Sequence, residues 1–359
     1  DAYAFKEAKK VTTQQLNFVA DKLETTNYGF LIEYNSAQSA KALSYLLQQG
    51  LKVRYTEKPF TYKGKSYERG TLILIKKGNT LDAINKAVKD LATQFQVKVN
   101  AVETGFMDSG LDFGSPDIKL INTPKVLLLN GEGASSTATG EVWNYFDSQL
   151  KYPLTIINTT DFANANLKNY NTIILADGYY KLLTDKSQSD KLKDFVKSGG
   201  KIVALEGAVS QLANLDLGFK LKEDGSDKKD EKGDYGLLKK YADRERDYLP
   251  NSIPGAIYKV ELDNTHPLAF GYSNTYYTLK QDANIYEFLK DGWNVGTLKK
   301  ENYITGFSGN KVLNKLKDGT VIGSIEYGNG NIIFLAEDPL FRLFWENGKL
   351  LFNNAIFLV

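Results

Sequence analysis

The chain offers few of the side chains that enzymes use as nucleophiles or bases. Its 359 residues include one histidine, His266, and no cysteine. Acyl-transfer chemistry on an α/β scaffold usually needs a histidine base or a cysteine nucleophile, and zinc hydrolases usually need at least two histidine ligands. A Cys–His–Glu triad therefore cannot form, and a Ser–His–Asp triad could use only His266. This composition predicts a folded body without catalytic residues, bound metal or cofactor.

Acidic residues are the remaining candidates for chemistry. Four of them come shortly after apolar runs that are typical of strands: Glu132, Asp177, Glu206 and Asp338. An open α/β sheet binds ligands at the carboxyl ends of its strands, so these acids could line one crevice for a cation, an amine or a sugar hydroxyl. Crowded carboxylates repel one another, and the nearby Arg342 is the candidate partner. The alternative is that the acids only cap helices and turns.

Three short motifs have plainer interpretations. Residues 131–136 (GEGASS) lack the lysine of a phosphate loop, and their glutamate would repel phosphate, so a tight strand-to-helix turn is favoured. Residues 177–179 (DGY) occupy the expected place of a nucleophile elbow, but Gly178 has no side chain with which to attack. His266 lies next to a proline in a segment bounded by glycine, a pattern typical of a structured turn.

The elements that would position these residues alternate between strands and helices. In residues 1–103, β-rich runs are separated by stretches with helical periodicity, and a hairpin is expected to turn at residues 63–64. This pattern predicts a small α/β domain. Residues 104–124 are rich in Gly, Ser, Asp and Pro and are predicted to be a linker.

Residues 125–359 are predicted to form the larger domain. Continuous apolar runs at 125–129, 172–175 and 201–205, with helices between them, indicate parallel strands that are buried on both faces. From residue 256 onward, strand signals come without intervening helices, which indicates an antiparallel addition. The predicted fold class is therefore α/β, a doubly wound and mainly parallel sheet with an antiparallel addition, preceded by the smaller α/β domain.

Charge and hydropathy exclude several classes of partner. The net charge is +2, from 45 basic and 43 acidic residues, and no basic stripe accompanies the many aromatic residues, so no nucleic-acid partner is expected. No run of about eighteen apolar residues occurs, so no membrane span is predicted. The absence of cysteine excludes disulfides and thiolate metal sites. A start at Asp1 and a single methionine favour a mature product or an excised fragment.

Several segments together resemble the C-terminal, non-peptidase region of large bacterial zinc carboxypeptidases. They are residues 43–59, 70–74, 125–150 with the run GEGASSTATGEVWNYF, 255–271 and 327–357. The resemblance implies a class I glutamine-amidotransferase-like (flavodoxin-like) fold that follows a catalytic domain, in an exported protein of the periplasm or the cell exterior. It transfers no zinc ligand and no cysteine nucleophile, because this chain has neither the family's HxxE pattern nor a cysteine.

The leading expectation is a non-catalytic accessory region of an exported zinc carboxypeptidase-like protein. This region would pack on the peptidase domain of the parent chain or help to bind a peptide or cell-wall substrate. Two alternatives remain open. One is a small-molecule hydrolase or transferase that uses the acidic crevice, and the other is a glycan-binding module that uses surface tyrosine and tryptophan side chains.

Overall fold

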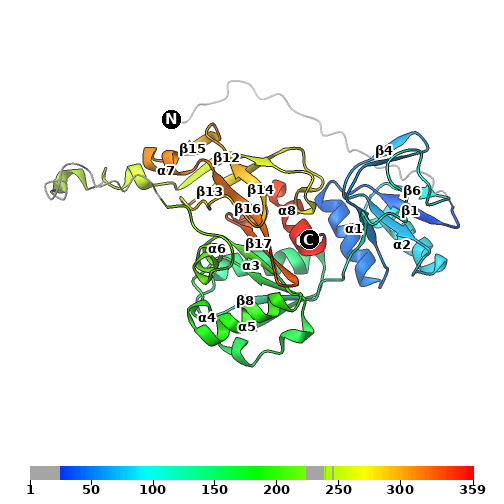
Figure 1. Cartoon of the computed structure of the whole chain (residues 1–359), viewed down its shortest axis with the longest axis horizontal. Helices are drawn as coiled ribbons and strands as arrows, with labels where there is room; N and C mark the ends of the chain where they lie inside the picture. The colour runs from blue at the N-terminus through cyan, green and yellow to red at the C-terminus, as the bar shows by residue number, and fades with distance from the viewer. Residues whose placement is uncertain (1–24, 224–237, 239, 245) are drawn as a thin grey trace, which may run out of the picture.

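The computed structural model describes residues 25–223, 238, 240–244 and 246–359, which form two α/β bodies (Figure 1). The first 24 residues of the predicted small domain lie outside the described residues. Buried side chains from both bodies belong to one continuous apolar core, which joins Leu43 and Leu46 of the first body to Phe352 and Ile356 of the second.

The first body is a five-stranded sheet in which every neighbouring pair is antiparallel. Its strand order is β6 (Val99–Val102), β1 (Gly29–Ile32), β5 (Leu72–Ile75), β2 (Arg54–Thr56) and β7 (Ile118–Leu120). Strand β7 lies within residues 104–124, so the end of the segment predicted as a linker pairs with the first sheet. The expected hairpin forms between β3 (Phe60–Tyr62) and β4 (Lys65–Tyr67).

Two amphipathic helices cover this sheet, and both begin at a side-chain cap. Helix α1 (Ala37–Gln48) starts at Ser36, whose hydroxyl accepts from the backbone N–H of Ser39 in a capping box. Helix α2 (Leu81–Gln94) starts at Thr80. Because apolar residues recur at helical spacing, each helix buries one stripe of side chains against the core.

The second body is built on a ten-stranded mixed sheet. Five parallel strands run in the order β17 (Gly330–Leu335), β11 (Lys201–Leu205), β10 (Thr172–Leu175), β8 (Val126–Asn130) and β9 (Leu154–Asn158). The antiparallel strands are β16 (Gly319–Tyr327), β14 (Trp293–Leu298), β12 (Gly255–Leu262), β13 (Thr275–Lys280) and β15 (Tyr303–Phe307). The α/β class is confirmed, but the sheet is half antiparallel rather than mainly parallel.

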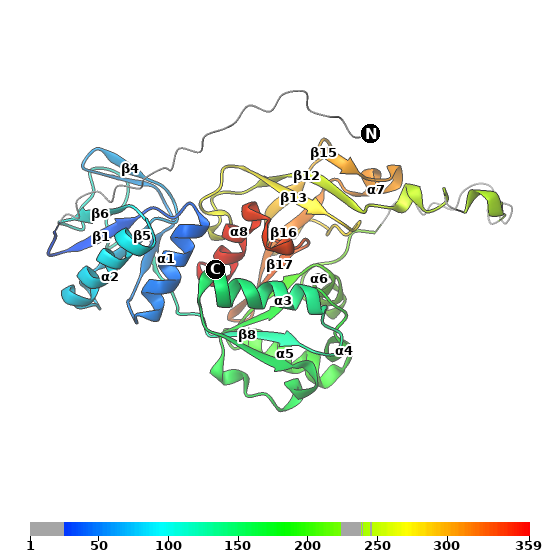
Figure 2. The ribbon, with the colours of Figure 1, turned by 180° about the vertical axis from the view of Figure 1, so that it is seen from behind.

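The parallel half has the predicted strand-and-helix alternation. Helices α3 (Ser136–Asn144) and α5 (Lys186–Lys197) lie on opposite sides of strand β8 in Figures 1 and 2. Leu127 of β8 and Ile174 of β10 are fully buried, as expected for strands that are covered on both faces. The other α-helices of the described residues are α4 (Lys181–Thr184), α6 (Gly207–Leu212), α7 (Asn310–Lys315) and α8 (Glu346–Phe357), and a π-helical segment, Tyr145–Leu150, continues α3.

Helix α8 joins the two bodies. It contacts α1 of the first body, and Figure 2 shows it between the first body and the large sheet. The Tyr55 hydroxyl donates to the Leu358 carbonyl at 2.9 Å, and the Ser44 hydroxyl donates to the Leu150 carbonyl at 3.1 Å. These buried hydrogen bonds fix how the bodies meet.

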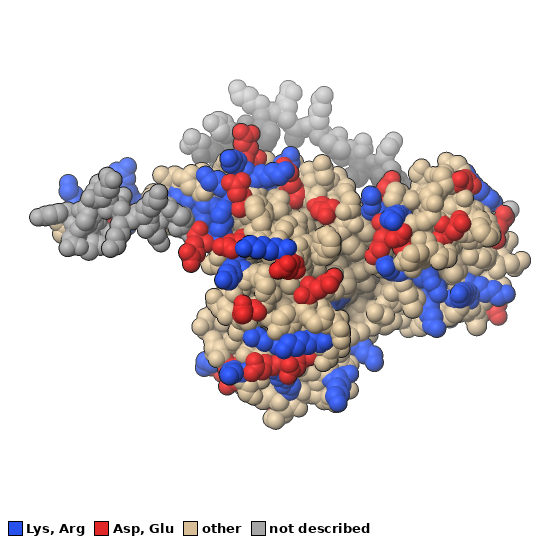
Figure 3. Space-filling view, viewed as in Figure 1, with Lys and Arg blue, Asp and Glu red and all other residues tan. Residues whose placement is uncertain are grey.

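The surface is electrostatically mixed. Figure 3 shows lysine and arginine interspersed with aspartate and glutamate over the visible face. No helix among the described residues is long and apolar enough to cross a bilayer.

Candidate functional site

The strand order of the parallel half reverses between β8 and β10, which is where an open α/β sheet usually leaves a ligand crevice. Here the two loops that flank this point are joined by their backbones. The Tyr179 N–H donates to the Gly133 carbonyl at 2.7 Å, and the Ser135 N–H donates to the Asp177 carbonyl at 2.8 Å. A Cβ at Gly133 would lie 2.2 Å from the Tyr179 oxygen. Backbone contacts therefore join the two loops at the point where the crevice was expected.

Glu132 is directed away from the other predicted acids by this arrangement. Its carboxylate forms an ion pair with Lys181 at the protein surface, and its side chain is 57% exposed. The Glu132 carbonyl accepts from the Thr159 hydroxyl at 3.0 Å. The residue therefore belongs to the rim of the sheet's carboxyl edge.

Glu206 occupies a strained turn between strand β11 and helix α6. Its backbone has φ 47° and ψ −119°, and the helix begins at the next residue. A sharp strand-to-helix turn of this kind presents the nucleophile in α/β hydrolases. The elbow is thus at Glu206 and not at residues 177–179, where the sequence placed it. At residues 177–179 the backbone instead pairs Gly178 with Ala134 across the two loops.

Asp177 anchors this elbow. Its Oδ1 accepts from the backbone N–H of Gly207 at 3.0 Å. A Cβ at residue 207 would lie 2.6 Å from that oxygen, so the contact requires glycine there. Burial raises the pKa of Glu206, and the nearby charge of Asp177 raises it further.

Asp338 lies beside Glu206 at the end of β17 and hydrogen-bonds to Glu141 of helix α3. Burial, then Glu141, and then the charge of Glu206 raise the pKa of Asp338 to about 9. Arg342 contributes its backbone N–H, which donates to Glu141 Oε1 at 3.0 Å, while its guanidinium lies over the Phe341 ring. The guanidinium of Arg342 is therefore not the predicted partner of these carboxyl groups.

The cation of this cluster is Lys280, from the last position of antiparallel strand β13. Its side chain is fully buried, pairs with Glu337 and Asp282, and donates to the Asn284 carbonyl at 2.7 Å. Burial alone would lower the pKa of Lys280, but the charges of Glu337 and Asp282 outweigh it and raise the pKa. Lys280 is therefore held as an ammonium ion in the interior.

The cluster holds more carboxyl groups than one lysine can neutralise, which changes their protonation. Burial first, and then the charges of Asp177, Asp282 and Glu141, raise the pKa of Glu206 to about 8. The raised pKa values of Glu206 and Asp338 favour their protonated forms at neutral pH, in which a carboxyl group can donate a hydrogen bond. Such groups can transfer a proton or bind a polar ligand, whereas a nucleophile would have to be ionised.

Three of the four predicted acids are therefore brought together: Asp177, Glu206 and Asp338. Sequence reasoning missed Glu141, Lys280 and Asp282. Glu141 lies within a helix, and the other two lie at or just beyond the end of an antiparallel strand whose neighbours could not be read from the sequence. Across the described part of the chain, no group of three or more His, Cys, Asp or Glu side chains is suited to hold a metal ion.

His266 caps a short helical turn and does not belong to the acidic cluster. Its Nδ1 accepts from the Leu268 N–H at 3.1 Å. Burial lowers the pKa of His266 to about 4, so the ring is neutral at physiological pH.

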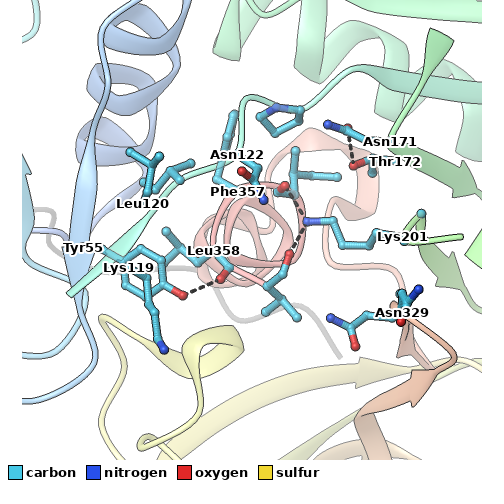
Figure 4. A pocket seen from close by; sticks show the side chains of 18 of the residues that line it. Tyr55, Lys119, Leu120, Asn122, Asn171, Thr172, Lys201, Asn329, Phe357 and Leu358 are labelled. Carbon is cyan, nitrogen blue, oxygen red and sulfur yellow. Dashed lines mark hydrogen bonds between the residues drawn. The ribbon is translucent and has the colours of Figure 1, made fainter. Parts of the chain in front are cut away.

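A cavity of about 400 Å³ opens at the opposite, amino edge of the parallel strands (Figure 4). The Lys201 ammonium donates to the carbonyls of Ile356 and Val359 at 2.7 and 2.5 Å, and the Tyr55 hydroxyl donates to the Leu358 carbonyl. Burial lowers the pKa of Lys201 to about 7. These polar groups form hydrogen bonds to the C-terminal end of helix α8. We therefore interpret this cavity as part of the interface between the two bodies.

Comparison with solved structures finds distant similarities. A ThuA-like protein from Bacteroides uniformis is 15% identical over 64% of this chain and 88% of its own, with a TM-score of 0.41. A glutamine amidotransferase from Thermotoga maritima is 12% identical over 64% and 95%, with a TM-score of 0.40. A β-galactosidase from Bacillus circulans is 13% identical over 64% and 29%, with a TM-score of 0.36. We take no function from similarities of this size.

Neither the models of known protein families nor the curated proteins include a match to this chain.

Proposed function

We propose that this chain is a non-catalytic accessory region of an exported zinc carboxypeptidase-like protein. It packs on the peptidase domain of the parent chain, or helps that domain to hold a peptide or cell-wall substrate, in the periplasm or outside the cell. The sequence resemblance over residues 125–150 and 327–357 motivates the choice of parent.

One observation carries the non-catalytic part of the proposal. The sharp turn after β11 holds Glu206, a partly buried carboxyl whose raised pKa of about 8 disfavours the ionised, nucleophilic form at neutral pH. The single histidine is occupied as a turn cap and is neutral. The carboxyl at this turn and the capped histidine both support a non-catalytic role.

The test joins genetics with biochemistry. The coding sequence before Asp1 is expected to encode an export signal and a domain with an HxxE zinc motif. Purified peptidase domain with and without this chain attached should differ in KM for peptides or in thermal stability, while the isolated chain releases no C-terminal residue. A gene that starts directly before Asp1, or an upstream domain unrelated to peptidases, would overturn the proposal.

A second candidate function is acid–base chemistry on a small molecule in the acidic cluster. The observation that favours it is a pair of carboxyl groups in different environments, because protonated Glu206 lies close to the hydrogen-bonded carboxylate of Asp177. Screening glycosides, esters and amides with wild type and Glu206→Gln decides between the two. Turnover that is lost in this variant supports the second candidate, and absence of turnover in wild type supports the accessory role.

A further inference from the structure

A second cavity, of about 350 Å³, lies between the two bodies on the side of the β3–β4 hairpin. The first body contributes the turn after β4, with Glu68 and Arg69. The second contributes residues 264–273, the yellow segment that reaches the blue body in Figure 1. Cavities of about 300 Å³ and above are of the size that holds small ligands. This volume suits a ligand as large as an amino acid or a dipeptide.

The walls of this cavity are fixed by close contacts between the bodies. A Cβ at Gly271 would lie 3.0 Å from the backbone oxygen of Tyr34 and 2.7 Å from the Leu350 side chain, and the φ of Gly271 is +84°. A Cβ at Gly70 would lie 3.0 Å from Phe270. Phe270 is buried and packs edge-on against Tyr55 at 6.2 Å between ring centroids. The cavity is thus formed in advance: buried Phe270 holds the two bodies together, and partly buried Tyr272 is an aromatic side chain of the lining.

The lining includes one acidic and one basic side chain that are available to bind a ligand. Glu33, which also lines the cavity, pairs with Lys65 at 2.5 Å. Within the part of the chain that the structure describes, the side chains of Glu68 and Arg69 have no hydrogen-bond or ion-pair partner. Arg69 is partly buried and offers the planar fork of donors that matches a carboxylate. Glu68 offers a carboxylate to an ammonium group.

We propose that this cavity binds a small zwitterion, a free amino acid or the charged ends of a short peptide. Arg69 binds the ligand's carboxylate, Glu68 binds its ammonium group, and Tyr272 contacts an apolar side chain. An uncharged sugar would pair with neither Arg69 nor Glu68. A simple anion could pair with Arg69, but its negative charge would lie close to that of Glu68. The site goes beyond the accessory role, because it is a property of this chain whether or not a peptidase domain precedes it.

The experiment measures binding of defined ligands to the purified chain by calorimetry. Glycyl-phenylalanine is compared with its N-acetylated form, its C-terminal amide and free phenylalanine. The zwitterionic dipeptide or free phenylalanine should bind, and blocking either end of the dipeptide should weaken binding about tenfold, as expected when a charged hydrogen-bond partner is lost. The ratio between dipeptide and free amino acid shows which source of zwitterion the site prefers.

Two variants assign the two charges. In Arg69→Gln, the dipeptide and its C-terminal amide should bind equally weakly, while acetylation still costs affinity. In Glu68→Gln, the acetylated and free dipeptides should become equal, while amidation still costs affinity. Lys76→Gln, an exposed lysine on the same body that does not line the cavity, is the matched control and should bind as wild type does.

Three results would overturn the proposed site. In the first, the wild-type protein binds neither the dipeptide nor phenylalanine. In the second, it binds the blocked ligands as tightly as the free dipeptide. The third is binding of glucose or N-acetylglucosamine without binding of either zwitterion. Circular dichroism and the thermal midpoint of each variant establish that it is folded. The comparison of free and blocked ligands on wild type needs no variant at all.

Discussion

Glu206 combines a strained backbone with a buried carboxyl group, and its protonation should be visible in stability. The pKa of Glu206 in the folded protein, about 8, lies above the value of about 4.3 for a glutamate in an unfolded chain. Between these two pH values the folded state binds the additional proton. The stability contributed by this group is therefore complete below the unfolded pKa of about 4.3, and it is lost as pH rises from there through about 8.

Glu206→Gln should remove this dependence, because the amide resembles the protonated carboxyl and cannot ionise. Urea unfolding at pH 5 and pH 9 measures the change. We expect similar stability to wild type at pH 5 and a gain on the order of 2–4 kcal/mol at pH 9. Glu132→Gln, the same change at an exposed ion pair, should show no such difference. The assignment fails if the stabilities of Glu206→Gln and wild type follow the same pH dependence.

Lys280 and Glu337 should be strongly coupled, because both are buried and each is the other's counter-charge. Lys280→Met leaves the Glu337 carboxyl without its cation and should cost about 3–5 kcal/mol. Adding Glu337→Leu should restore most of that loss. Denaturant unfolding of the two single variants and the double variant measures the coupling free energy. Additive losses in the double variant would show that the pair does not act as a unit.

The sequence predicted those residues of the candidate site that directly follow a recognisable strand. Asp177, Glu206 and Asp338 could be found because each follows an apolar run that ends at the same sheet edge. Glu132 follows such a run too, but the pairing of its loop with Tyr179 turns its side chain outward. Lys280 could not be found, because its place beside Glu337 depends on the order of antiparallel strands.

At the scale of elements, the loops after β8 and β10 act as one unit. Gly133 has a φ of +87°, and a Cβ there would collide with the Tyr179 backbone. The same backbone contact sets where Asp177 meets the elbow. The elbow therefore depends on a glycine in a different loop.

Gly133→Ala should accordingly destabilise the protein by about 2 kcal/mol or more, since both the conformation and the space oppose a methyl group. Gly140→Ala is the matched control, because Gly140 lies within helix α3 with no atom near its missing Cβ. That variant should stabilise the protein by about 0.5–1 kcal/mol. Thermal unfolding of both variants gives the comparison. Equal effects would mean that the loop contact at Gly133 is unimportant.

Elements with a strong period were predictable, and their partners were not. Helices α1 and α2 and the parallel strands β8, β10 and β11 match the expected segments, because apolar spacing and caps are local signals. The antiparallel half was expected only as an addition, yet it supplies half of the large sheet. Strand pairing is set by contacts between distant segments, which a local pattern does not record.

At the scale of the whole molecule, the two bodies share one core and should unfold together. The chain has three tryptophans, Trp143, Trp293 and Trp345, and all of them lie in the second body. Tryptophan fluorescence therefore reports on that body alone, whereas far-ultraviolet circular dichroism reports on both. The two signals should give the same thermal midpoint for the wild-type protein.

Leu46→Ala tests this coupling from the body that contains no tryptophan. Leu46 lies on α1, is fully buried, and belongs to the core shared with α8. Its truncation should cost about 2–5 kcal/mol. Because the core is continuous, the fluorescence midpoint of the second body should fall together with the circular dichroism midpoint. Lys86→Ala, at an exposed position of α2, should move neither signal. If Leu46→Ala lowers only the circular dichroism transition and leaves tryptophan fluorescence unchanged, the two bodies unfold independently and the shared core does not couple them.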